Sequence, residues 1–379
     1  GPIYEEKEYR GISSFVNFLI FKSNKKYSKN DIKEILGDNG SIYDVIMKKS
    51  DSIFKILTVK NKFKDVIDVL YNCVTNLQFK DEEIEEVRLH IKNIIENINA
   101  SGFKKTMHLI PLSVYGYSDY GEQIFGYENT IKNINKELLE EYKRKYYTPD
   151  NLTIFLEGNV DENDVNLLVD YFSKFEGKRD KLKNPSKDKG MNIVDRTSRP
   201  DFSYYAFSIS IDKKKFSEYD PLIFLFTYGK NKLLDNILVK KYNISFNATI
   251  NFTVHYDDEV ILSFFLERIN GYKINLINKA IEEFLNEMKS IDEKYIKNVV
   301  NNHILNNYDM MFNLNEKIWE DALLYPHTGK LYEDYYRELI DRMLNVKSKD
   351  IDEFAKIVEK VIYEGNYVII NSVDKNMFM

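Results

Sequence analysis

A polar segment between Glu176 and Lys189 constrains the fold most strongly, because it divides the 379 residues into two nearly equal halves. The segment is rich in charged residues and almost free of apolar ones, which is typical of a linker. A chain of 379 residues is also too long to fold around one compact core. We therefore predict two domains, residues 1–178 and 190–379, with a linker at 176–189.

Both halves show strand-like and helix-like patterns in a similar order. In residues 62–77, apolar side chains recur every three or four positions, as they do on a helix that covers a sheet. Ser28 and Asp31 form a capping-box signature at the start of another helix. The first half is predicted to contain helices at 29–36, 62–77, 81–99, 135–147 and 162–175, and strands at 41–47, 52–60 and 152–157.

The second half repeats this order. It is predicted to contain strands at 202–210, 244–254, 260–268 and 366–372, and helices at 219–229, 272–288 and 292–307, with further helices to about 362. We therefore predict an α+β protein of two similar domains, each a mostly antiparallel β-sheet covered by helices. The similar order of elements indicates duplication.

Composition excludes several classes of function. The formal net charge is −6 and no basic block is interleaved with aromatic residues, so we expect no nucleic acid partner. There is no run of about 18 apolar residues, so we expect no membrane partner. The single cysteine, Cys73, cannot form an internal disulfide and favours a reducing compartment. We expect the cytoplasm, with the mitochondrion as the alternative.

A predicted helix over residues 11–21 has the sequence Gly-Ile-Ser-Ser-Phe-Val-Asn-Phe-Leu-Ile-Phe. It resembles the active-site helix of the insulinase and processing-peptidase family, which carries the inverted zinc motif His-x-x-Glu-His. In that family both histidines share one helix face and bind zinc, and the glutamate activates the zinc-bound water. The scaffold positions of this frame are kept here at Gly11, Ile12, Phe15, Leu19, Phe21 and Lys22.

The three chemical positions of the motif hold Ser14, Asn17 and Phe18. Serine is too short to replace an imidazole, asparagine cannot take a proton from water, and phenylalanine has no lone pair. Ile94 stands at or next to the position of the family's third zinc ligand, a glutamate on a long charged helix. The resemblance therefore implies a degenerate site with no catalytic residues, no bound metal and no activity of the chain on its own.

A second block supports the resemblance. Residues 146–161, Tyr-Tyr-Thr-Pro-Asp-Asn-Leu-Thr-Ile-Phe-Leu-Glu-Gly-Asn-Val-Asp, are very close to the family's Tyr-Thr-Pro-Asn-Asn strand and Gly-Asp-Val turn. The family normally has two or three strands before the zinc motif, whereas ten residues precede Gly11 here. We expect missing strands rather than a different fold. The resemblance implies the half-clamshell architecture of processing peptidases.

The family also implies candidate residues for substrate binding. An arginine and a tyrosine in its second half hold the substrate carbonyl, and the matching stretch here is 233–246. Val239 and Phe246 fall at these two positions, and Lys240 or Tyr242 could substitute for them if the register slips by one. The alternative is that Phe246 is a core strand residue and Lys240 a surface charge. Tyr43 stands where the family has an asparagine beside the cleft.

Two further candidate sites have simpler explanations. Glu86 and His90 lie four residues apart on a predicted helix and could touch one ion, but the same helix looks simply acidic and solvated. Cys73 has no candidate base near it in the sequence, so a thiol nucleophile is not expected.

The resemblance leads to one main hypothesis about function and to three alternatives. The main hypothesis is a non-catalytic subunit of a heterodimeric zinc processing protease. Its active His-x-x-Glu-His partner alone would hold zinc, while this chain supplies chamber wall and binds peptide by β-augmentation, with peptide maturation as one expected role. The alternatives are a structural core-type subunit without a proteolytic role, a metal-free peptide-binding module such as a homodimer, and an active enzyme.

Overall fold

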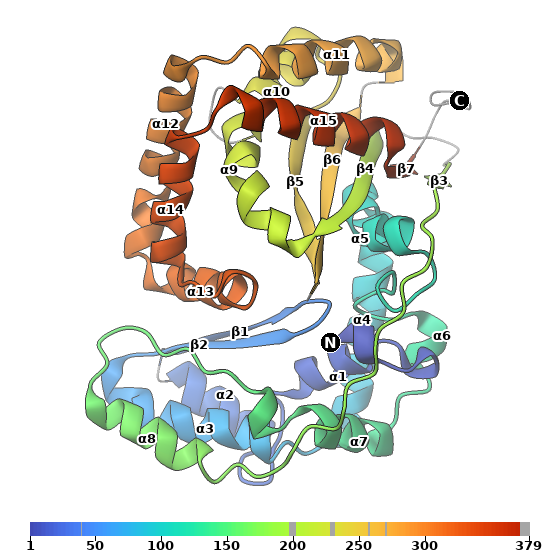
Figure 1. Ribbon diagram of the computed structural model, residues 1–379. Helices are drawn as coiled ribbons and strands as arrows, with labels where there is room; N and C mark the ends of the chain where they lie inside the picture. Colours follow the sequence, from blue (N-terminus) through green and yellow to red (C-terminus); the bar gives the residue numbers. More distant parts are fainter. Residues whose placement is uncertain (39, 197–201, 228–231, 257, 270, 372–379) are drawn as a thin grey trace. The chain divides into compact units, whose positions relative to one another are not determined.

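The computed structural model describes residues 1–38, 40–196, 202–227, 232–256, 258–269 and 271–371 (Figure 1). The chain forms two compact units. Unit 1 comprises Gly1–Asn97 and Glu122–Ser186, and unit 2 comprises Ile98–Gly121 and Lys187–Met379. The units differ from the predicted domains in one segment, because Ile98–Gly121 lies within the first half of the sequence but belongs to unit 2.

Unit 1 is built mainly from helices, together with a two-stranded antiparallel sheet. Its strands are β1 (Ile42–Met47) and β2 (Ser52–Leu57), and its helices are α1 (Ile12–Leu19), α2 (Lys29–Asp38), α3 (Phe63–Thr75), α4 (Asp81–Ala100, which continues into unit 2), α6 (Glu128–Ile131), α7 (Lys136–Tyr146) and α8 (Glu162–Phe172). Short 3₁₀ helices lie at Pro2–Tyr4, Lys7–Tyr9, Lys60–Lys62 and Pro149–Asn151.

The periodic apolar pattern of the first half produces the core of unit 1. On α3, Val66, Val69 and Cys73 point into a cluster that also receives Val87 and Ile91 of α4. These residues are three or four positions apart, so each helix presents one apolar face to the core. The predicted capping box is also present, since the Ser28 backbone N–H donates to Asp31 and the Asp31 N–H to Ser28.

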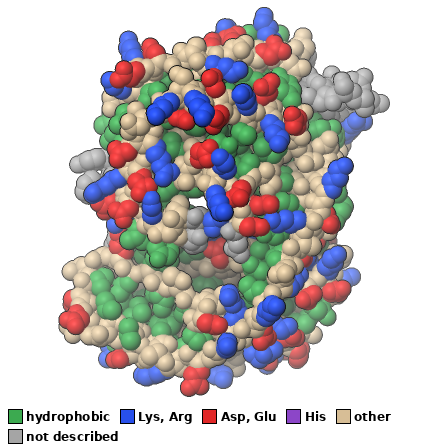
Figure 2. Space-filling model, viewed as in Figure 1, with side chains coloured by type: hydrophobic (Ala, Val, Ile, Leu, Met, Phe, Trp, Pro, Cys, Tyr) green, Lys and Arg blue, Asp and Glu red, His purple; other side chains and the backbone are tan. Residues whose placement is uncertain are grey.

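The strand expected at 152–157 is not formed, and these residues have no regular secondary structure. A strand needs a neighbour to receive its backbone hydrogen bonds, and the described sheet of unit 1 contains only β1 and β2. Apolar side chains remain exposed nearby in the sequence, including Val165 and Val169 on α8. Figure 2 shows apolar side chains gathered on the surface of unit 1.

Unit 2 contains a larger, mostly antiparallel sheet. Its strands are β3 (Ile193–Asp195), β4 (Ser203–Asp212), β5 (Asn247–His255), β6 (Glu259–Ile269) and β7 (Asn366–Ile370), in the order β3-β7-β4-β6-β5. Only the pairing of β3 with β7 is parallel among these described strands. The predicted α+β class is confirmed, although the two described sheets differ in strand number.

The helices of unit 2 surround this sheet. They are α5 (Gly102–Tyr115), α9 (Phe216–Thr227), α10 (Leu233–Asp235), α11 (Ile277–Met288), α12 (Glu293–Phe312), α13 (Leu314–Thr328), α14 (Tyr332–Leu344) and α15 (Ser348–Glu364). A π-helix follows α10 at Asn236–Lys241, and 3₁₀ helices lie at Lys213–Lys215 and Gly271–Leu276. No helix among the described residues combines the length and apolar composition needed to cross a membrane.

The alternation of side chains along β4 and β6 explains why helices cover both faces of the sheet. Tyr205 and Phe207 of β4 and Phe264 of β6 point into the main core of unit 2, which α15 and α9 complete. The residues between them face α5, where Phe265 packs edge-on against Phe103 with ring centroids 5.4 Å apart. Both faces are therefore buried.

Helix α5 is absent from the predicted elements. It begins after Ser101, whose side chain accepts a hydrogen bond from the Lys104 N–H as an N-cap, and it ends at Gly116. Pro111 lies inside the helix, where proline is usually disfavoured. Packing against β4 and β7 overrides that local preference, and only the tertiary structure provides it.

We predict that α15 stabilises unit 2 through the side chains on its buried face and not through those on its exposed face. Phe354→Ala removes a ring that is 0% exposed and should lower the free energy of unfolding by about 3–5 kcal/mol. Tyr363→Ala on the same helix removes a side chain that is 50% exposed and should change it by less than about 0.5 kcal/mol. Urea denaturation followed by circular dichroism measures both values. Equal losses would contradict this assignment of faces.

Candidate functional site

The helix that carries the motif positions, α1, is held at its N-terminus by a buried carboxylate. The backbone N–H groups of Gly11 and Ser13 donate to the two oxygens of Glu5, at 2.7 and 2.8 Å. These N–H groups have no partner within the helix, and a negative charge is favourable at this end of the helix dipole. Burial raises the pKa of Glu5, while the hydrogen bonds from Ser13 and Gly11 oppose that shift.

Two glycines allow the chain to pass close to itself beside α1. Gly11 has φ +99°, and a Cβ atom there would lie 2.6 Å from the Phe125 carbonyl oxygen. Gly126 has φ +68°, and a Cβ atom there would meet the Arg10 backbone. Only glycine combines this conformation with so close an approach. The frame glycine at position 11 is therefore required by backbone geometry, independently of any catalytic role.

The polar residues at the first two motif positions are engaged in structural hydrogen bonds. Ser14 is fully buried, and its Oγ donates to the Ile124 carbonyl at 2.7 Å. The Asn17 amide donates to Ser52 Oγ at 2.8 Å and accepts from the Tyr147 hydroxyl at 3.1 Å. Both ends of this amide are thus occupied, and an amide cannot take a proton from water.

The third motif position is filled by an aromatic contact. The Phe18 ring meets His90 of α4 edge-on, with centroids 4.8 Å apart, and stacks on Phe125 at 6.4 Å. His90 lies one helical turn before Ile94, the residue that the sequence places at or next to the third ligand position. Ile94 is half-buried. On α4, Phe18 therefore makes its ring contact with His90, one turn before Ile94.

The donor set at α1 does not fit a zinc ion. The positions of the family's ligands offer a hydroxyl already donated to a carbonyl, a fully bonded amide and a phenyl ring. Zinc sites use thiolate, imidazole or carboxylate ligands, three or four at a time. Within the part of the chain that the structure describes, no group of three or more His, Cys, Asp or Glu side chains could hold a metal ion.

A buried charged group next to α1 has no signal in the sequence. Lys49 is 4% exposed, and its ammonium donates to the Glu122 carbonyl oxygen. The Glu122 carboxylate lies 3.8 Å from the guanidinium of the buried Arg10. Burial lowers the pKa of Lys49 to about 7. These three residues come from distant parts of the chain, so their meeting could not be read from spacing.

The candidate substrate contact in unit 1, Tyr43, lies on β1 and is 40% exposed. Its ring packs against Phe21 of the motif segment, with centroids 4.9 Å apart. Tyr43 therefore stands next to the motif segment and remains accessible, which is consistent with a role in binding.

The candidate contacts in unit 2 lie around the π-helix Asn236–Lys241. Lys240 is exposed, and its ammonium donates to Asn236 Oδ1 at 2.8 Å. The Tyr242 hydroxyl donates to Glu283 at 2.7 Å. Phe246 is 67% exposed and lies under the Arg268 guanidinium at 5.2 Å. The expectation of a core strand residue at Phe246 is wrong, because β5 begins one residue later.

The two simpler explanations for the other candidates fit the structure. Glu86 forms ion pairs with Lys29 at 2.6 Å and Lys22 at 3.2 Å, on the exposed face of α4. Cys73 is buried in the core of unit 1, and burial raises the pKa of its thiol to about 12. A thiol with so high a pKa is almost entirely protonated at neutral pH and is a poor nucleophile.

Comparisons with known proteins agree with this fold. Residues 1–124 match the family model for insulinase (peptidase family M16), and residues 133–302 match that for the peptidase M16 inactive domain. The chain is 24% identical over 178 residues to the uncharacterized zinc protease YmxG of Bacillus subtilis. It is 27% identical over 178 residues to the alpha subunit of the human mitochondrial-processing peptidase.

These curated relatives match over part of their length. The aligned region covers 47% of this chain and 44% of YmxG, and 46% of this chain and 33% of the human subunit. The crystal structure of a protease from Helicobacter pylori superposes with a TM-score of 0.85 at 17% identity, covering 98% of this chain and 92% of that chain. The fold is that of a zinc-peptidase family. The chain belongs to the insulinase family of peptidases, family M16.

We predict that Asn17 now serves the stability of unit 1. Asn17→Ala leaves the Ser52 and Tyr147 hydroxyls without their amide partner, so the free energy of unfolding should fall by about 1–3 kcal/mol. Asn163→Ala, at an exposed position of α8, is the matched control and should change it by less than about 0.5 kcal/mol. Urea denaturation measures both, and an unchanged stability of the first variant would refute the structural role.

Lys49 should make stability depend on pH. Its folded pKa of about 7 lies below the ordinary value for lysine, so the unfolded chain binds an extra proton between about pH 7 and pH 10. Stability should therefore rise with pH in this range, by at most about 1.4 kcal/mol per pH unit from this group. Below about pH 7 the full penalty for the buried charge remains.

The Lys49→Met variant should lose this rise. Unfolding free energies of the native chain and the variant, measured at pH 7, 8 and 9, give the difference directly. Lys92→Met, which removes a half-exposed ammonium on α4, is the control and should keep the native pH dependence. Parallel curves for the native chain and Lys49→Met would mean that Lys49 is not buried as a low-pKa amine.

Proposed function

We propose that this chain is the non-catalytic subunit of a zinc processing protease. The observation that carries the proposal is helix α1, whose scaffold is kept while its three chemical positions are turned to other uses. Ser14 and Asn17, both buried, hold hydrogen bonds to neighbouring segments, and Phe18 packs against His90. A scaffold maintained without its chemistry supports a role that depends on shape and binding surface.

The proposal assigns the zinc and the peptidase chemistry to a homologous partner with an intact His-x-x-Glu-His motif. The similarity to a subunit of the mitochondrial-processing peptidase supports a multi-subunit assembly. The partner would supply the metal and the activated water, and this chain would supply wall and peptide contacts. On its own, the chain is proposed to have no peptidase activity.

Peptide binding is proposed to use the small sheet of unit 1. The described sheet has two strands, so each strand has one edge without a neighbour among the described strands. An extended peptide can add to such an edge through backbone hydrogen bonds, which tolerate varied side chains. Tyr43 belongs to β1 and its side chain is exposed, so it would contact a peptide bound along this strand.

The test is to isolate the chain from its native cells and identify what accompanies it. We expect a homologue with an intact His-x-x-Glu-His motif, in a complex of one copy of each. The two chains mixed together should cleave an unstructured peptide, and each alone should not. Tyr43→Ala should raise the KM of the mixture by a few-fold while leaving assembly intact, as judged by size-exclusion chromatography.

Metal analysis gives a second test, which could overturn the proposal. The purified chain should contain no stoichiometric zinc, and the zinc of the complex should be accounted for by the partner. One zinc per copy of this chain, measured by inductively coupled plasma mass spectrometry, would overturn the proposal. Isolation only within a large membrane complex, without any peptidase homologue, would favour the structural alternative.

A further inference from the structure

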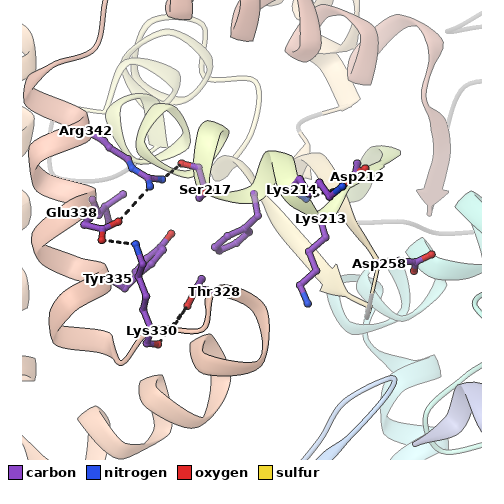
Figure 3. Close-up of a pocket in the computed structure, with 12 residues that line it drawn as sticks. Asp212, Lys213, Lys214, Ser217, Asp258, Thr328, Lys330, Tyr335, Glu338 and Arg342 are labelled. Atoms are coloured by element: carbon purple, nitrogen blue, oxygen red, sulfur yellow. Dashed lines mark hydrogen bonds and ion pairs between the residues drawn. The ribbon is translucent and has the colours of Figure 1, made fainter.

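Unit 2 contains a cavity of about 470 Å³ whose lining includes none of the candidate site residues (Figure 3). It is lined by the β4–α9 turn at residues 212–217, by Asp258 just before β6, and by the α13–α14 turn at residues 328–330 together with α14. Its volume is within the range of small-ligand sites in proteins. The cavity is formed by unit 2 alone.

The base of the cavity is apolar and well ordered by packing. Phe216, Tyr335 and Leu339 line it and are each less than 9% exposed. The rings of Phe216 and Tyr335 stack with centroids 6.2 Å apart. The Tyr335 hydroxyl donates to the buried carboxylate of Asp220, which fixes the orientation of the ring. Such a base accepts an apolar or aromatic side chain without first having to rearrange.

The rim of the cavity is charged, with more basic than acidic side chains. Lys213, Lys214, Lys330 and Arg342 are the basic residues, and Asp212, Asp258 and Glu338 are the acidic ones. Asp258 is already compensated from outside the cavity, because Lys187 lies 2.7 Å from its carboxylate and the Tyr120 hydroxyl donates to it at 2.6 Å. In Figure 3, Asp258 lies apart from the cluster around Glu338.

One internal carboxylate holds the two cations at the α14 side. Glu338 accepts a hydrogen bond from Lys330 through one oxygen and from Arg342 through the other, the latter at 3.3 Å. Arg342 also donates to the Ser217 carbonyl at 2.6 Å, which orients its guanidinium beside the cavity. Figure 3 shows Lys330 and Arg342 reaching Glu338 from its two sides. A single carboxylate thus joins the two cations at the edge of the cavity.

We propose that this cavity anchors a peptide through a carboxylate that lies next to an apolar or aromatic side chain. The apolar side chain would rest on Phe216 and Tyr335, and the carboxylate would pair with Lys330 and Arg342 in competition with Glu338. Ammonium and guanidinium donors form charge-assisted hydrogen bonds with carboxylates, and the planar guanidinium adds directionality. The proposal deepens the proposed peptide-binding function and rests on it.

The experiment uses the full chain alone and calorimetric titration with three probes. Acetyl-Ala-Ala-Phe with a free C-terminal carboxylate tests a peptide terminus, and acetyl-Ala-Phe-Asp-amide tests an internal acidic side chain. Acetyl-Ala-Ala-Phe-amide is the neutral control. We expect at least one acidic probe to bind and the neutral probe to bind at least about tenfold more weakly, because it lacks the charge. The stronger acidic probe identifies the source of the carboxylate.

Two variants separate this site from a merely structural cluster. Lys330→Gln should weaken binding of the acidic probe about tenfold, and Glu338→Gln should strengthen it by a similar factor, because the competing carboxylate is removed. Lys297→Gln, which changes an exposed ammonium paired with Glu293 on α12, should leave binding unchanged. Thermal unfolding verifies that each variant is folded before it is titrated.

Several outcomes would overturn the proposal. These are equal binding of acidic and neutral probes, no binding of either acidic probe at millimolar concentration, or weaker binding by Glu338→Gln. Binding of inorganic phosphate without either peptide would also overturn it, since the cavity would then be a general anion site. None of these results requires a partner or catalysis, so they are distinguishable from a failure to isolate an active partner.

Discussion

The contact between the Glu5 carboxylate and the first turn of α1 underlies the rest of unit 1. It satisfies two backbone N–H groups, at Gly11 and Ser13, that the helix cannot satisfy itself. Because these bonds are buried, they fix where the helix starts, and the apolar side chains Ile12, Phe15, Val16 and Leu19 turn into the core. The positions of Ser14, Asn17 and Phe18 follow from that placement, since a helix is rigid over two turns.

The three motif positions of α1 take part in contacts within unit 1. In a zinc peptidase the polar face of this helix presents ligands to a metal. Here the same positions bind neighbouring segments: Ser14 to the Ile124 carbonyl, Asn17 to Ser52 and Tyr147, and Phe18 to His90. Each of the three side chains therefore has a partner in the surrounding structure.

How far the sequence predicts the fold depends on whether the signal is local. The helices α3 and α4 and the hairpin of β5 and β6 follow from periodicity, and their observed bounds lie within a few residues of the predicted ones. Helix α5 is not among the predicted elements; Pro111 is locally unfavourable inside a helix, and packing on the sheet stabilises it. The segment at 152–157 has a strand-like pattern, but the described sheet offers it no neighbour.

For the candidate sites, too, the sequence settles some properties and the tertiary structure settles others. The sequence by itself determined the chemistry that α1 can offer, because side-chain identity fixes which atoms can donate or accept, whatever the fold. Only the tertiary structure decided what those atoms contact, that Phe246 is exposed, and that Lys330, Glu338 and Arg342 line one cavity with Phe216. The physical reason is that burial and long-range pairing depend on segments that are distant along the chain, and spacing in the sequence does not record them.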